Sequence, residues 1–138
     1  MTLLDAYALI AFLTGGPATS QVRAILREGE AAVTTANLVE VLYVSERVRG
    51  LPILRTMEIL EPLFGQSLAV VALDLTIARR AAQVRTRHYH RSSRPISLAD
   101  AVLIASAGQE DRIATADSDV LAVAAEENLA PVALPGQG

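Results

Sequence analysis

Short apolar runs alternate with longer segments of helical periodicity along the whole chain, and this alternation restricts the fold more than any other feature. Strands that alternate with helices predict βαβ units, in which helices cover both faces of a parallel sheet. We therefore predict an α/β fold with a central parallel sheet of four to five short strands. The predicted strands are residues 2–5, 31–34, 68–73, 112–115 and 130–134.

Turn and capping residues set the limits of the predicted helices. Gly15 and Gly16 end the first helix, and Gly50 ends the third. Thr35 or Asn37 is the expected N-cap of the third helix. The run at 68–73 is continuously apolar, which is typical of a strand buried on both faces. The predicted helices with defined limits cover residues 6–13, 35–49, 53–64, 97–107 and 118–127. Two more are expected: one that ends near residue 29 and a long one that begins after residue 74.

The length of 138 residues indicates one domain, which we place at residues 1–134, followed by a loose carboxyl-terminal tail at residues 135–138. No run reaches the ~18 uncharged apolar residues of a membrane span. The apolar start of the chain lacks the basic residues of a signal peptide. The absence of cysteine excludes disulfides and thiolate metal sites, and we expect a cytoplasmic protein.

Two acids lie at the ends of predicted strands: Asp5 ends the first strand, and Asp117 lies just past the fourth. In a doubly wound sheet the ligand crevice lies beyond the carboxyl ends of the strands, so both side chains should open into it. Each of them could also simply cap the helix that follows, which is the only role we expect for Asp74.

Glu40 and Asp100 lie within predicted helices. Glu40 has apolar neighbours, and because glutamate is almost never fully buried unless it is paired, it either faces solvent or is held at a site. Asp100 closes the pattern Ser97-x-x-Asp100, which is typical of a capping box. One oxygen of Asp100 could accept the capping bond while the other binds a metal ion. Asp119 is a weaker candidate, because acids are common in the first turn of a helix.

Together these acids predict a metal site. Clustered carboxylates repel one another and raise each other's pKa, which favours a divalent cation that neutralises them. Carboxylate and water oxygens suit Mg²⁺ or Mn²⁺, and two such ions ~3.5–4 Å apart can activate water and stabilise the leaving oxygen of a phosphodiester. We expect one or two ions. The predicted ligands are Asp5, Glu40, Asp100 and Asp117, with Asp119 as a further candidate.

The absence of lysine excludes several other proteins with acidic pockets. Phosphoacceptor receiver domains and haloacid-dehalogenase-like phosphatases also gather aspartates at strand ends, but both depend on a lysine in the pocket, and this chain has none. A P-loop needs the same residue. A zinc site is disfavoured because the chain has no cysteine.

All 12 basic residues are arginines, and half of them lie between residues 79 and 94 together with both histidines. No acid lies between Asp74 and Asp100, so this basic segment is suited to a phosphate-bearing partner. The alternative is a solvated helix face whose arginine stems cover apolar surface. The arginines of the basic segment are Arg79, Arg80, Arg85, Arg87, Arg91 and Arg94.

Four short motifs carry the predicted acids in order along the chain. They are Leu4-Asp5-Ala6-Tyr7, Asn37-Leu38-Val39-Glu40-Val41, Ser97-Leu98-Ala99-Asp100-Ala101 and Thr115-Ala116-Asp117-Ser118-Asp119. In this order and spacing they resemble the motifs of the PIN-domain ribonucleases, and most closely the VapC-type toxins of bacterial and archaeal toxin–antitoxin pairs. The resemblance covers essentially the whole chain. It departs at one point: the family often has serine or threonine just after the first acid, where this chain has Ala6 and Tyr7.

The resemblance implies a single PIN-like domain with metal-dependent endoribonuclease activity, in which the four acids hold Mg²⁺ or Mn²⁺ and RNA phosphodiester bonds are cleaved. It also implies a homodimer, and inhibition within a toxin–antitoxin hetero-oligomer by a VapB-like antitoxin whose tail enters the acidic groove. Two alternatives stay open. The chain could be a PIN-like RNA-processing nuclease that is not a toxin, or a non-catalytic module that binds RNA or a protein partner.

RNA as the substrate gives the basic segment a role. The loop that leads into the helix of the third acid carries Arg91 and Arg94, so chain connectivity places them nearer to the acids than Arg79 or Arg80. Arginine binds phosphate bidentately. We predict that Arg87, Arg91 and Arg94 bind RNA phosphates beside the cut. We expect Arg79 and Arg80 to pack or to form salt bridges instead.

Overall fold

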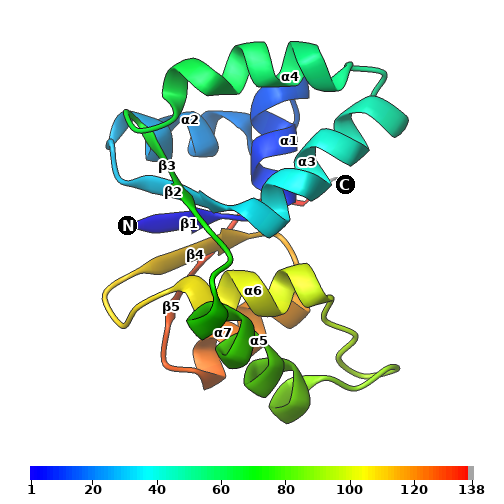
Figure 1. Cartoon of the computed structure of the whole chain (residues 1–138), viewed down its shortest axis with the longest axis vertical. Helices are drawn as coiled ribbons and strands as arrows, with labels where there is room; N and C mark the ends of the chain where they lie inside the picture. Colours follow the sequence, from blue (N-terminus) through cyan, green and yellow to red (C-terminus); the bar gives the residue numbers. More distant parts are fainter. Residues whose placement is uncertain (137–138) are drawn as a thin grey trace.

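The computed structural model describes residues 1–136 and contains a five-stranded sheet with the strand order β3-β2-β1-β4-β5 (Figure 1). All neighbouring strands are parallel, which confirms the predicted α/β fold. Residues 137 and 138 of the predicted tail lie outside the described residues. The strands are β1 (Thr2–Leu4), β2 (Ala31–Thr34), β3 (Leu68–Val71), β4 (Arg112–Thr115) and β5 (Ala130–Ala133).

Helices cover both faces of the sheet, with α1 to α4 on one side and α5 to α7 on the other (Figure 1). Within residues 1–136, none of the helices combines the length and the apolar character that crossing a bilayer requires. The cytoplasmic location stays a prediction. The helices are α1 (Ala6–Thr14), α2 (Thr19–Arg27), α3 (Thr35–Arg47), α4 (Ile53–Leu60), the 3₁₀ helix η1 (Glu61–Leu63), α5 (Leu75–His88), α6 (Leu98–Ser106) and α7 (Ser118–Glu126).

The central strands supply side chains to both apolar cores in alternation. Leu4 packs in the core beneath α1 to α4, whereas its neighbour Leu3 packs in the core beneath α5 to α7. In β2, Val33 likewise packs in the core beneath α1 to α4, and Ala32 packs in the core beneath α5 to α7. A slip of one residue would exchange the two faces, so this burial fixes the register in which Leu4 pairs with Ala114. The acids that follow β1 and β4 therefore emerge at the same edge of the sheet.

Side-chain caps begin most helices at this carboxyl edge. Asp5, Thr34 and Asp117 lie at the ends of β1, β2 and β4, and each accepts a hydrogen bond from the first turn of the next helix. Asp74 caps α5 as predicted, and Ser97 begins α6 with the predicted capping box. The edge thus combines acidic side chains with helix amino termini.

The prediction for the third strand is wrong in two respects. β3 ends at Val71 rather than at residue 73, and it is not buried on both faces, since Val70 is 39% exposed. The reason is its position in the sheet: β3 is an edge strand that pairs only with β2.

The capping residue of α3 and the end of α4 also differ from the prediction. Thr34, rather than Thr35 or Asn37, caps α3, because its hydroxyl oxygen accepts the backbone N–H of Asn37 at 3.0 Å. The helix predicted at 53–64 ends at Leu60. Pro62 lacks the N–H needed to continue α-helical bonding, and the chain tightens into η1 instead.

Candidate active site

An open cavity of about 410 Å³ lies at the carboxyl edge of the sheet. Four carboxylates from four separate segments line it: Asp5 after β1, Glu40 in α3, Asp100 in α6 and Asp117 after β4. The structure thus brings the four predicted ligands together, whereas Asp119 is not among the residues that line this acidic cavity. The other lining residues are Ala6, Tyr7, Asn37, Ala116 and Gly136.

Asp5 is the most buried of the four acids, with 8% of its surface exposed. Its Oδ1 accepts the backbone N–H of Ala8 at 2.9 Å, and its Oδ2 accepts the hydroxyl of Thr115 at 2.5 Å. Burial raises the pKa of Asp5 to about 6 in spite of these bonds, and the charges of Asp100 and Glu40 add to the rise. A negative charge at Asp5 is therefore poorly compensated by the protein.

Two buried polar residues beside the acids were not among the predicted site residues. Thr115 donates to Asp5 and also accepts the backbone N–H of Asp117 at 3.0 Å, so it links two of the acids. Asn37 lines the acidic cavity, and its side-chain oxygen accepts the hydroxyl of Thr34 at 3.1 Å. Asn37 precedes Glu40 by three residues, a spacing that places both on one face of α3 and could have identified Asn37.

Asp100 forms the capping box with Ser97. Its Oδ2 accepts the backbone N–H of Ser97 at 2.9 Å, while Ser97 Oγ accepts the backbone N–H of Asp100 at 3.0 Å. Its Oδ1 accepts no hydrogen bond from residues 1–136, so this oxygen is available to a ligand. Burial raises the pKa of Asp100, and the charges of Asp117 and Asp119 raise it further.

Glu40 and Asp117 are the more exposed acids of the cavity. Partial desolvation raises the pKa of Glu40, and the charge of Asp100 adds to the effect. Asp117 caps α7 through Oδ1, which accepts the backbone N–H of Asp119 at 2.8 Å. Asp119 thus affects the cavity through its backbone and its charge rather than as a lining side chain.

The four acids fit Mg²⁺ or Mn²⁺ in their chemistry, because all supply carboxylate oxygens. Three of them have raised pKa values, and no basic side chain among residues 1–136 forms an ion pair with any of the four. In the same part of the chain, however, no three acidic or histidine side chains lie close enough to form a ready-made metal site. The acids could hold a cation once their side chains move toward one another.

Ion pairs with α7 occupy part of the basic segment. Arg87 pairs with Glu127 at 2.8 Å, and Arg94 pairs with Glu126. Arg91 is exposed and forms no ion pair within the described chain. None of these three arginines lines the acidic cavity, so their role in RNA binding stays a prediction.

The salt bridges expected as one role for Arg79 and Arg80 do not form within residues 1–136. Both are exposed, and neither forms a salt bridge with any residue from 1 to 136. The buried face of α5 presents Ala81 and Val84, and Arg80 lies at the border of this face, one turn before Val84. The acids that pair with the basic segment are the last residue of α7, Glu126, and its C-cap, Glu127. Nε2 of His88, at the end of α5, also lies 2.6 Å from Glu127.

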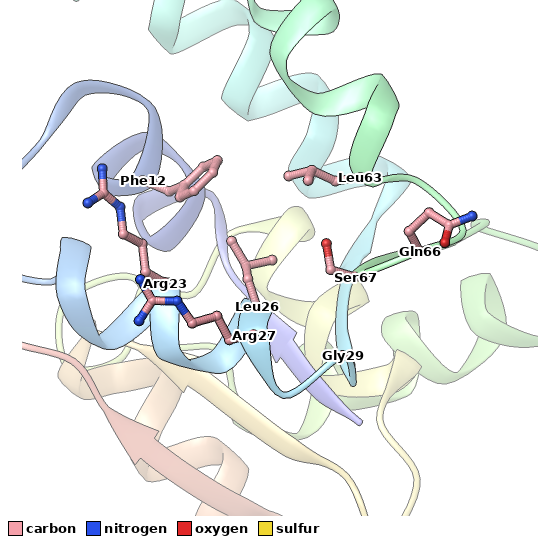
Figure 2. A pocket seen from close by; sticks show the side chains of 8 residues that line it. All are labelled: Phe12, Arg23, Leu26, Arg27, Gly29, Leu63, Gln66 and Ser67. Carbon is pink, nitrogen blue, oxygen red and sulfur yellow. The ribbon is translucent and has the colours of Figure 1, made fainter.

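A larger cavity of about 570 Å³ lies away from the acids (Figure 2). Its lining residues Gly29 and Ser67 precede β2 and β3, so it lies at the opposite, amino-terminal edge of the sheet. Figure 2 shows the apolar side chains of Phe12, Leu26 and Leu63 converging on it. Two arginines but no carboxylate or histidine line this cavity. It therefore lacks the groups for acid–base or metal chemistry, in spite of its size.

Solved structures share this fold. FitAcB from Neisseria gonorrhoeae is 25% identical, with a TM-score of 0.67 over 95% of this chain and 96% of that chain. VapBC from Salmonella typhimurium, in a DNA-bound crystal structure, is 19% identical, with a TM-score of 0.71 over 96% of both chains. A toxin–antitoxin complex from Klebsiella pneumoniae is 17% identical, with a TM-score of 0.65 over 88% of this chain and 91% of that chain. No curated protein matches the chain in sequence.

The family model of the PIN domain matches residues 2–126, a range that includes all four acids of the cavity. PIN domains are generally nucleases, so the match indicates a hydrolase that acts on nucleic acids. The parallel sheet and the acids at its carboxyl edge agree with the resemblance seen in the sequence. The chain therefore belongs to the PIN-domain family.

Proposed function

We propose that the chain is a metal-dependent endoribonuclease and the toxin component of a VapBC-type toxin–antitoxin pair. The observation that carries this proposal is the cavity of a PIN fold in which four carboxylates from distant parts of the sequence meet. Hydrolysis of a phosphodiester needs an activated water and stabilisation of the leaving oxygen. Carboxylates that gather divalent cations at one edge of a sheet meet both needs.

The proposed ligands of Mg²⁺ or Mn²⁺, as one or two ions, are Asp5, Glu40, Asp100 and Asp117. When bound, the cation supplies positive charge and Lewis-acid activation of water. The acids of the described chain do not form a ready-made cluster, so cation binding requires movement of their side chains. Burial chiefly, and the neighbouring acids in addition, raise the pKa values of Asp5, Glu40 and Asp100, which supports a cation that compensates their charge.

The chain itself positions these acids before any ligand binds. Both oxygens of Asp5 are held, one by the first turn of α1 and the other by Thr115. Ser97 holds one oxygen of Asp100 and leaves the other available. Asp5 and Asp100 are therefore held by the chain, so the side-chain movement that cation binding requires falls mainly on the more exposed Glu40 and Asp117.

Substrate and partners are proposed from the family and from the structural relatives. RNA is the substrate, and the solved toxin–antitoxin complexes support a VapB-like antitoxin as the partner. The proposal also includes a homodimer and a cytoplasmic toxin–antitoxin hetero-oligomer.

An RNA cleavage assay tests the proposal. The parent chain should cleave structured RNA in the presence of Mg²⁺ or Mn²⁺, and cleavage should stop when EDTA removes the ion. Asp100→Asn keeps the shape of the side chain but removes a ligand charge, so the rate should fall by roughly 10²–10³-fold. Asp119→Asn should do less, because Asp119 does not line the cavity.

Asp74→Asn is the matched control, since it makes the same chemical change at the N-cap of α5, outside the acidic cavity. It should keep the parent rate. Parent rates in both Asp100→Asn and Asp5→Asn would remove these residues from the site. A parent chain that cleaves no RNA with either ion would instead favour a binding module.

A further inference from the structure

The segment that follows β5 returns to the acidic cavity. Leu134 is buried, and its backbone N–H donates to the carbonyl of Thr115 at 2.9 Å. The carbonyl of Pro135 accepts the hydroxyl of Tyr7 at 2.6 Å. Gly136 is one of the residues that line the acidic cavity. Residues 134–136 thus carry the chain to the cavity, where Gly136 forms part of the wall, and two hydrogen bonds hold the segment there.

Tyr7 supplies the contact that is specific to a side chain. It lies in the first turn of α1, two residues after Asp5, and it lines the cavity itself. Its hydroxyl reaches a carbonyl 128 positions later in the chain. Tyr7 is only partly buried, and its ring packs against the core beneath α1 to α4, which leaves the hydroxyl free to contact Pro135.

Thr115 connects this wall to the acids. Its backbone carbonyl accepts a hydrogen bond from the N–H of Leu134, while its hydroxyl donates one to Oδ2 of Asp5. The wall and the most buried acid are therefore built on the same residue at the end of β4. The bond from Tyr7 to Pro135 is independent of this link, because it leaves both oxygens of Asp5 with their partners.

We propose that Tyr7 is a positioning residue, whose hydroxyl fixes residues 134–136 as a wall against which the substrate strand binds beside the acids. The inference rests on the nuclease function proposed above and adds the carboxyl-terminal segment to its binding surface. A wall that contacts the strand throughout the reaction contributes equally to ground-state and transition-state binding. Its loss should therefore raise KM and leave kcat unchanged.

Three variants test this inference: Tyr7→Phe, a chain that ends at Leu134, and the combination of the two. Tyr7→Phe removes one hydroxyl and keeps the ring, so KM for the RNA that the parent chain cleaves should rise by roughly two- to tenfold, the usual worth of one hydrogen bond. The shortened chain should show a rise at least as large. The combined variant should show no further rise over the shortened chain, because its wall is already absent.

Tyr43→Phe is the matched control, since Tyr43 is 59% exposed and its hydroxyl has no hydrogen-bond partner in residues 1–136. It should keep the parent KM. A second measurement does not depend on activity: the amide of Leu134 should exchange with solvent several-fold faster in Tyr7→Phe than in the parent chain or in Tyr43→Phe.

Three results would overturn the inference. If Tyr7→Phe raised KM as much in the shortened chain as in the full chain, the phenol would contact RNA directly. A fall in kcat at constant KM would mean that Tyr7 acts on the acids. Unchanged exchange at Leu134 would mean that the hydroxyl does not fix the wall. A parent chain that cleaves no RNA would refute the proposed function and the substrate role of the wall, and the exchange result would still decide whether Tyr7 holds it.

Discussion

Replacing Asp5 with asparagine should stabilise the metal-free chain at neutral pH. Asp5 is 8% exposed, and burial raises its pKa to about 6 from the ordinary value of 3.8. At about 1.36 kcal/mol for each unit of pKa, the difference corresponds to roughly 3 kcal/mol by which the charged carboxylate destabilises the folded state. Asparagine carries no charge and avoids this penalty.

The hydrogen bonds of Asp5 offset part of the gain. The amide oxygen of asparagine can still accept the N–H of Ala8, so the cap of α1 is kept. The amide nitrogen replaces the oxygen that accepts the hydroxyl of Thr115. The Thr115 hydroxyl then loses this hydrogen bond and must rotate to donate to another acceptor. That rearrangement costs about 1 kcal/mol, the usual worth of one hydrogen bond. The expected net gain is about 2 kcal/mol well above pH 6.

The gain should depend on pH in a defined direction. Because the folded pKa of Asp5 is above the unfolded one, the folded state binds the proton more tightly, and the penalty is absent below about pH 3.8. The penalty grows as the pH rises toward about 6 and is constant above it. At low pH only the lost hydrogen bond remains, so Asp5→Asn should be less stable than the parent by about 1 kcal/mol.

Urea unfolding in EDTA at several pH values between about 4 and 8 measures this reversal. Asp74→Asn changes an exposed N-cap in the same way and should stay within about 0.5 kcal/mol of the parent. The reasoning fails if Asp5→Asn is no more stable than the parent at high pH, or if the difference between them does not change with pH.

Two further predictions concern ligands. Mg²⁺ or Mn²⁺ at 100 times the dissociation constant should raise the free energy of unfolding by roughly 2.7 kcal/mol, which a higher melting temperature would show. Asp100→Asn should reduce this rise. A melting temperature that neither ion changes would contradict the metal site. In the Asp100→Asn background, Arg91→Gln should reduce the slope of log affinity for RNA against log salt concentration by roughly 0.7. Arg94→Gln should reduce this slope less, because Arg94 is paired with Glu126. An unchanged slope in both variants would show that the basic segment is a solvated surface.

The parts of the site that follow local rules could be predicted from the sequence. Asp5 and Asp117 lie at strand ends and cap helices, and both features depend on a few neighbouring residues. The capping box of Ser97 and Asp100 is equally local. Once the strands are recognised as parallel, the acids at their carboxyl ends must share one edge.

The parts that depend on contacts between distant segments could not be predicted. An apolar run does not reveal whether its strand lies at the centre or the edge of a sheet, which is why β3 was expected to be buried on both faces. The pairing of Arg87 and Arg94 with α7 depends on how helices pack on one face of the sheet. The bond from Tyr7 to Pro135 joins the two ends of the described chain, and no local pattern marks it.

The distribution of ion pairs favours a cationic ligand in the acidic cavity. Arg55, Arg87, Arg94 and Arg112 all pair with glutamates remote from the cavity. The four acids that line the cavity receive no such partner from residues 1–136, although burial and mutual repulsion raise the pKa of three of them. Buried carboxylates without a compensating charge destabilise a fold, so positive charge brought by a ligand is strongly favoured there. The proposed divalent cation would supply this charge, and a basic side chain from the tail of the proposed antitoxin would supply it in the same place.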